Sequence, residues 1–228
     1  MKVTAAKLIN SATLSAVAAG LLFVVIQAIH PADSLASVTT SAWAVVHYVS
    51  IAMAILFVIG IAGIYAKQVE EVGWLGLAGF VVLSLGLLLT AAFQFVEAAV
   101  EPILASSAPG FVEGVLGLVE GHPSAVDLGA LPTLWSVSSA LFLAGTVLFG
   151  IATLRAGIVP RVASVLFAFG VFLAGPAVAL IGSPRLAAVP IGLGLAWMGF
   201  ALWSERRRSS TQPRLGTATP HAEQTAAA

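Results

Sequence analysis

Four polar side chains recur at helical spacing near the middle of the chain. They are Thr90, Gln94, Glu97 and Glu101. Their separations of four, three and four residues place them on one face of a helix. The neighbouring residues are apolar, and a polar stripe on such a helix is unfavourable where it faces lipid. We therefore expect the stripe to face the interior of a bundle, where its carboxyl groups could bind a cation or exchange a proton. The alternative is that the helix emerges into water after Phe95 and the carboxylates are solvated.

Histidines add to these candidates. At a rise of about 1.5 Å per helical residue, His47 and Glu97 reach a similar depth on neighbouring helices, so they could meet. Histidine and carboxylate side chains together suit a divalent metal such as zinc or manganese. However, the chain has no HxxH or HExxH pair. The sequence identifies no catalytic residue and no organic cofactor, and its candidates for binding a ligand or a metal are His30, His47, Gln94, Glu97, Glu101 and His122.

The composition indicates where these residues lie. Of the 228 residues, 59% are hydrophobic and 9% are charged, whereas soluble domains have roughly 25% charged residues. Such a chain belongs in a lipid bilayer. It has no Cys, which excludes disulfides and thiolate chemistry. We expect no nucleic-acid partner, because a basic aromatic surface is lacking.

Six apolar runs are long enough to cross a bilayer, which takes about 20 helical residues. We expect helices, because strands with unpaired edges are not stable in lipid. The first run could instead be a secretory signal, although it is longer than the usual apolar core of one. The prediction is an all-α, six-helix transmembrane domain over residues 1–204, with spans at 5–29, 41–66, 73–100, 131–154, 160–181 and 186–203, followed by a disordered cytoplasmic tail at 205–228.

Positive charges are distributed unevenly between the two sides. With six spans, nine of the ten Lys and Arg residues fall on one side and only Arg185 falls on the other. Positively charged loops stay in the cytoplasm, so we predict a multi-pass protein of the bacterial inner membrane with both termini cytoplasmic. The acidic residues 94–130 then lie on the outer side. Trp43, which begins the second span there, is predicted to be an anchor at the headgroups.

The outer loop 101–130 contains a short apolar segment. Residues 111–120, FVEGVLGLVE, are too few to span and are bounded by Gly and Pro residues. We predict an interfacial helix over the outer mouth of the bundle. It could act as a lid or simply lie among the headgroups.

The segment LFGIATLRAGIVPR, residues 148–161, resembles a turn of uncharacterised bacterial multi-pass membrane proteins. They are frequent in high-GC actinobacteria and similar to a domain-of-unknown-function family. The likeness has an R-x-G-x-x-P-R core and covers mainly the last three predicted spans. It implies an integral membrane protein of six or seven helices, and it implies no activity and no catalytic residue.

Three functions remain open. The first is binding of a small cation or an amphipathic ligand at the acidic, histidine-bearing outer mouth. The second is a non-catalytic accessory subunit, with a protein partner or a second copy in the bilayer. The third is a membrane enzyme acting on a lipid-like substrate, with His47 or Glu97 as general acid or base. The first two fit the sequence better than the third.

Overall fold

The computed structural model describes residues 2–181 and 184–211, and the regular elements of this part of the chain are all helices. Long helices dominate it, as expected for a chain whose apolar runs must satisfy their own backbone hydrogen bonds. The long helices are α1 (Ala5–Ile29), α3 (Ser41–Lys67), α4 (Val69–Phe95), α7 (Leu131–Ala156), α8 (Arg161–Ile181) and α9 (Ala188–Thr211). The shorter elements are α2 (Leu35–Val38), the π-helix η1 (Val96–Val100), α5 (Glu101–Leu104), α6 (Pro109–Glu120) and the 3₁₀-helix η2 (Pro184–Ala187).

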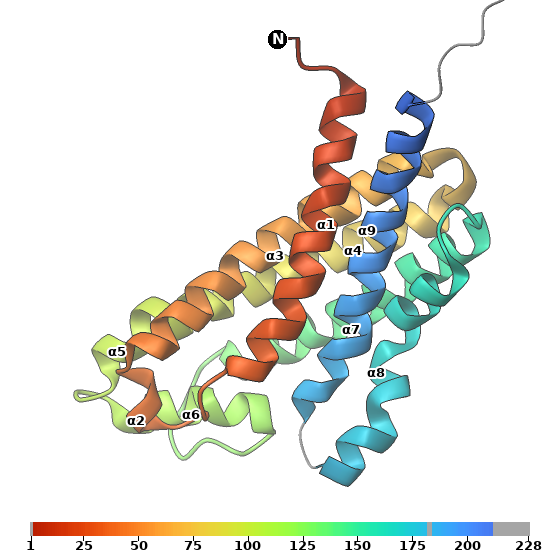
Figure 1. Ribbon diagram of the computed structural model, residues 1–228. Coiled ribbons are helices and arrows are strands. Elements are labelled where there is room, and N and C mark those ends of the chain that lie inside the picture. Colours follow the sequence, from red (N-terminus) through yellow and green to blue (C-terminus); the bar gives the residue numbers. More distant parts are fainter. Residues whose placement is uncertain (1, 182–183, 212–228) are drawn as a thin grey trace, which may run out of the picture.

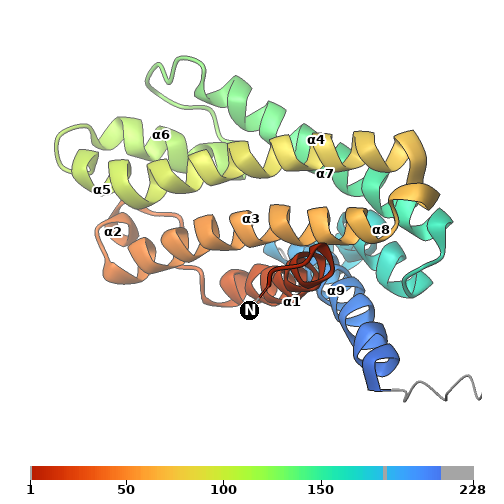
Figure 2. The same ribbon diagram turned by 90° about the horizontal axis from the view of Figure 1, so that it is seen from above.

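The long helices form a closed ring in the order of the chain (Figure 1). Helix α3 packs on α1 and α4, α7 packs on α4 and α8, and α9 closes the ring by packing on α8 and α1. Figure 2 shows α3 and α4 lying side by side. The core contains Phe57, Phe149, Phe167 and Leu195. The start of α1 and the end of α9 lie at one end of the ring, and α2, α5 and α6 lie at the other.

Five helical stretches are long and apolar enough to cross a membrane. The span predicted at 160–181 corresponds to α8 and is not among these five stretches. The chain therefore has the character of a multi-pass membrane protein, while the sixth span and the orientation stay predictions. The five stretches are Ala5–Ile29, Ser41–Lys67, Val69–Leu104, Leu131–Ala156 and Arg185–Glu205.

Two helix ends differ from the predicted boundaries. Helix α4 begins at Val69 rather than at residue 73, but Gly73 has φ 53° and ψ −152°, so the helix is broken there after its first turn. Helix α9 continues to Thr211, past the predicted end at residue 203, because residues 205–208 are Glu and Arg, which favour helix. The predicted disordered tail 205–228 is thus helical over its first seven residues, 205–211. Residues 212–228 lie outside the described residues.

Glycines let the backbones of α4 and α7 approach closely. A Cβ atom at Gly145 would lie 2.3 Å from the backbone nitrogen of Leu83. A Cβ atom at Gly86 would lie 2.6 Å from the backbone nitrogen of Phe142. Small residues at such contacts are the usual means of helix packing in lipid, where burial of apolar surface gives no driving force between helices.

We expect Gly145→Ala to destabilise the bundle by about 1–3 kcal/mol, because the added methyl group forces α4 and α7 apart. The measurement is the thermal unfolding of the purified protein in detergent. Gly175→Ala on α8 is the matched control, since a Cβ there meets no described atom within 4 Å. Equal unfolding temperatures for the two variants would contradict the close α4–α7 contact.

Candidate functional site

Five of the six candidate residues come together at the end of the bundle that carries α2, α5 and α6 (Figure 1). His30 caps the end of α1, His47 lies in the first half of α3, and Gln94 lies near the end of α4. Glu97 lies in η1 and Glu101 begins α5. The polar stripe therefore faces the interior of the protein.

Pro102 accounts for the shape of the helix that carries these carboxyl groups. Proline has no N–H, and its ring clashes with the carbonyl group four residues earlier, so a regular α-helix cannot continue through it. The chain instead forms the π turn Val96–Val100, in which the N–H of Glu101 donates to the carbonyl of Val96. In an α-helix this N–H would bind the carbonyl of Glu97. The carbonyl of Glu97 is thus free to accept a hydrogen bond from another helix.

Trp43 supplies that hydrogen bond. Its indole Nε1–H donates to the backbone oxygen of Glu97 at 2.8 Å, which ties α3 to the π turn. The side chain is fully buried, because Val38 of α2 and Val112 and Leu116 of α6 pack around it. Trp43 is therefore a structural part of the site, and the prediction that it anchors the chain at the headgroups is wrong.

His47 and Glu97 face each other inside the protein. Nε2 of His47 lies 3.4 Å from Oε2 of Glu97, and the two side chains are only 1% and 7% exposed. Nδ1 of His47 lies 2.7 Å from the carbonyl oxygen of Trp43. Because a carbonyl only accepts, Nδ1 carries the hydrogen of this bond. Gln94 donates from Nε2 to the same Oε2 of Glu97 at 2.8 Å.

Glu101 is the least satisfied group of the site. The residue is 0% exposed. Neither of its carboxyl oxygens has a hydrogen-bond partner among the described residues. Glu97 lies within electrostatic range of it. A buried charged group without a partner is strongly unfavourable, so this carboxyl group needs a positive partner or a proton.

His30 and Asp33 form the rim of the site. The ring of His30 lies edge-on to the ring of His47, with centroids 5.0 Å apart. Its Nδ1 is 2.7 Å from the carbonyl oxygen of Pro31 and 3.8 Å from Oδ1 of Asp33. Arg185 donates to Oδ2 of Asp33 at 2.5 Å. The one cation predicted on the outer side therefore pairs with an acidic residue next to the site.

Burial lowers the pKa of His30, because the imidazolium form loses hydration. The nearby Arg185 guanidinium acts in the same direction, whereas the carbonyl of Pro31 and the carboxylate of Asp33 oppose it. In the folded protein His30 thus favours its neutral form more than a solvated histidine does.

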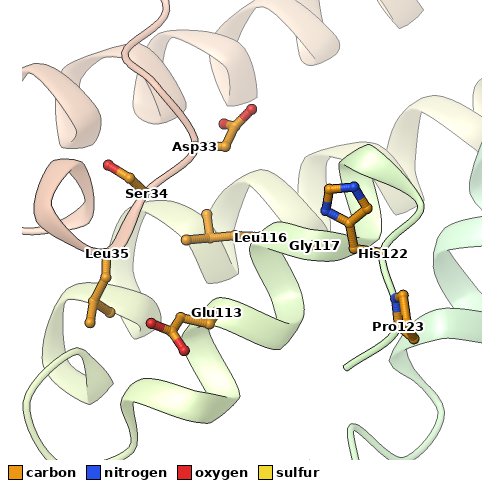
Figure 3. Close-up of a pocket in the computed structure, with 8 residues that line it drawn as sticks. All are labelled: Asp33, Ser34, Leu35, Glu113, Leu116, Gly117, His122 and Pro123. Atoms are coloured by element: carbon orange, nitrogen blue, oxygen red, sulfur yellow. The ribbon is translucent and has the colours of Figure 1, made fainter. Parts of the chain in front are cut away.

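The sixth candidate, His122, lies apart from the other five. It is exposed at the turn after α6. It lines a surface pocket of about 310 Å³ between α6 and residues 33–35. Figure 3 shows Leu116 between the Asp33 segment and His122. The pocket is lined by Asp33, Ser34, Leu35, Glu113, Leu116, Gly117, His122 and Pro123.

The short helix predicted in the outer loop is present as α6, but its packing is more specific than predicted. Val112, Val115 and Leu116 are buried, while Glu113 on the opposite face is exposed. The apolar side of α6 packs on Trp43 and α2. The helix therefore covers the site.

The described residues contain no group of three or more His, Asp or Glu side chains placed to hold a metal ion. The geometry thus gives no support to the divalent metal considered from the sequence. Comparisons of the chain with protein-family models, with curated proteins and with solved structures found no match. The family resemblance of residues 148–161 stays a prediction.

Sequence reasoning missed three parts of the site: the hydrogen bond of Trp43, the π turn, and the Asp33–Arg185 ion pair. Two signals were present in the sequence. Pro102 follows Glu101 directly, which predicts a disturbed helix at that point. Arg185 is the lone cation predicted among outer acidic residues, so an ion pair was to be expected.

We expect Trp43→Phe to lower the stability by about 1–3 kcal/mol, because the buried carbonyl of Glu97 loses its donor while the aromatic packing is largely kept. Thermal unfolding in detergent measures the effect. Trp74→Phe is the matched control, since Trp74 is 85% exposed. An unchanged unfolding temperature for Trp43→Phe would show that the hydrogen bond contributes nothing to the fold.

The lowered pKa of His30 predicts a pH dependence of stability. Between the folded pKa and the unfolded value of about 6.5, the unfolded chain binds a proton that the folded protein does not. Stability therefore falls as the pH is lowered through this interval. In His30→Gln this contribution is absent, so its unfolding temperature should fall less steeply than that of the wild type between neutral and mildly acidic pH. His122→Gln is the control for loss of an imidazole, and equal slopes for wild type and His30→Gln would contradict the shift.

Proposed function

We propose that this protein is a multi-pass membrane protein that binds a small cation among Glu101, Glu97 and His47. The observation that carries the proposal is the fully buried carboxyl group of Glu101, whose oxygens have no donor in the described part of the chain. Glu97 adds a second carboxyl group, which receives a hydrogen bond from Gln94. The site thus has more acceptors than donors, and a bound cation would balance them.

Burial favours a small ligand over an amphipathic one. His47 and Glu101 are 0% exposed and Glu97 is 5% exposed, so the surrounding side chains already enclose the site. A proton needs no cavity of its own, and among larger cations this enclosure favours a small monovalent ion. A divalent metal would need more ligands than this cluster offers.

The distribution of charge supports an outer position for the site. Nine of the ten Lys and Arg residues lie on the other side in the six-span topology. The start of α1 and the end of α9 lie at the end of the ring opposite α2, α5 and α6. We therefore propose a bacterial inner-membrane protein with cytoplasmic termini, whose site opens toward the extracytoplasmic side.

The two rival functions have less support than cation binding. A membrane enzyme would need a cavity that brings a lipid-like substrate to Glu97 or His47, whereas the pocket of Figure 3 is lined by Asp33 and His122 and by neither of these residues. An accessory role, with a protein partner or a second copy, stays a prediction from the sequence.

The test is the dependence of thermal unfolding on cations. The purified wild-type protein in detergent is titrated with Na⁺, with K⁺ and with protons. A cation that binds only the folded state raises its stability by about 2.7 kcal/mol at a hundred times its dissociation constant. We expect at least one of the three cations to raise the unfolding temperature, in contrast to the loss of stability that protonation of His30 causes.

The variants Glu101→Gln and Glu97→Gln keep the shape of the side chains but remove their charge, so they should lose this dependence. Glu113→Gln is the matched control, because Glu113 is an exposed carboxylate on the same side. A wild type that responds to none of the cations, or a Glu101→Gln variant that responds as the wild type does, would rule out the proposed site.

A further inference from the structure

Titratable side chains continue without a break from Glu97 to the surface pocket. Glu97 is 3.4 Å from His47, whose ring centroid is 5.0 Å from that of His30. His30 lies 3.8 Å from Asp33, which lines the pocket of Figure 3. The separations of 3.4 Å and 3.8 Å are short enough for proton transfer directly or through one water molecule, and the rings of the two histidines are in contact. Three segments of the chain, the loop at 30–33, α3 and η1, thus contribute to a single line of groups.

The rim of this line is more exposed than its buried end. The side chains of His30 and Asp33 are each 11% exposed, whereas those of His47 and Glu97 are 1% and 7% exposed. Water can reach the first pair, but the second pair is enclosed by α3, η1 and the cover formed by α6. The line of groups therefore offers a proton a path from the rim to this buried pair.

His47 and Glu97 face each other through Nε2 of the imidazole and Oε2 of the carboxyl group. Since Nδ1–H is used by the carbonyl of Trp43, neutral His47 presents a bare Nε2 to Oε2 of Glu97. Two acceptors facing each other in a buried site repel unless a hydrogen lies between them. Nε2 has no hydrogen-bond partner among the described residues, and one proton held by the pair, as a carboxylic acid beside neutral histidine or as a carboxylate beside imidazolium, would supply it.

We infer that the cation bound at this site is a proton, and that it reaches Glu97 from the pocket under α6 by way of His30 and His47. This inference rests on the proposed function and specifies its ligand. A proton from pocket water adds to His30 and passes to Nε2 of His47, whose Nδ1–H stays bonded to the carbonyl of Trp43. It then passes from Nε2 to the carboxylate of Glu97. Only N–H and O–H bonds form and break, and no electron is transferred. Asp33 stabilises the positive charge while it is on His30.

Other charged groups bias each step. Asp33 and Arg185 act electrostatically on His30, His47 and Glu97, and they act with opposite sign. Glu101 acts on Glu97, and its unpaired oxygens make it a second place where the proton can reside. The ion pair of Asp33 with Arg185 limits the net negative charge at the rim, so larger cations are attracted there only weakly.

The experiment is a rapid pH jump on the full-length protein in detergent, followed by infrared absorption. The carboxylic-acid C=O band of Glu97 is identified as the band that is missing in Glu97→Gln. After a jump to acidic pH, we expect this band to appear in His30→Gln at least about tenfold more slowly than in the wild type. The final amplitude of this band in His30→Gln should match the amplitude that the same variant shows after equilibration at the acidic pH.

His30→Phe is the second variant, since it keeps a ring against Trp43 and His47 but cannot carry a proton, and it should slow the band in the same way. Glu71→Gln, which changes an exposed carboxylate at the start of α4 outside the line of groups, should keep the wild-type rate. A wild-type rate in both His30 variants would overturn the route and leave cation binding intact. A Glu97 band that appears at no pH, with stability still dependent on Na⁺ or K⁺, would show that the bound cation is a metal ion.

Discussion

The hydrogen bond from the indole of Trp43 to the backbone of Glu97 determines the geometry of the site. The same residue also accepts, through its own carbonyl group, the Nδ1–H of His47. Trp43 thus fixes both partners of the His47–Glu97 pair, one through its side chain and one through its backbone. The cover formed by α2 and α6 excludes water from this bond, and a hydrogen bond in such surroundings is harder to replace than one exposed to solvent.

The long helices and the inward position of the stripe could be predicted from the sequence because both depend on the bilayer. Apolar runs of sufficient length are hard to mistake, and a carboxyl group on such a helix is strongly disfavoured on the lipid side. Depth counted by residue number placed His47 level with Glu97, and the two are indeed adjacent. Those inferences needed only local spacing and a single strong physical constraint.

The parts that were missed depend on packing between segments far apart in the sequence. Trp43 was expected at the headgroups, because indole rings favour that position when nothing covers them, but α6 covers this one. Likewise, His122 was grouped with the other histidines by residue type alone. The turn after α6 places it at the surface pocket, which Asp33 also lines, and away from His30 and His47. Helical periodicity assumes an α-helix throughout, so it could not show that the backbone of Glu97 is available to Trp43.

The π turn before Pro102 also affects how this chain compares with others. A π turn contains one residue more than the α-helical turn it replaces. A related chain with a straight helix in this region would therefore align with a one-residue gap near residues 96–100. Such a chain could keep every acidic residue and still lack the free carbonyl that positions Trp43. An insertion or deletion at this point would then be a better marker of the site than the identity of its side chains.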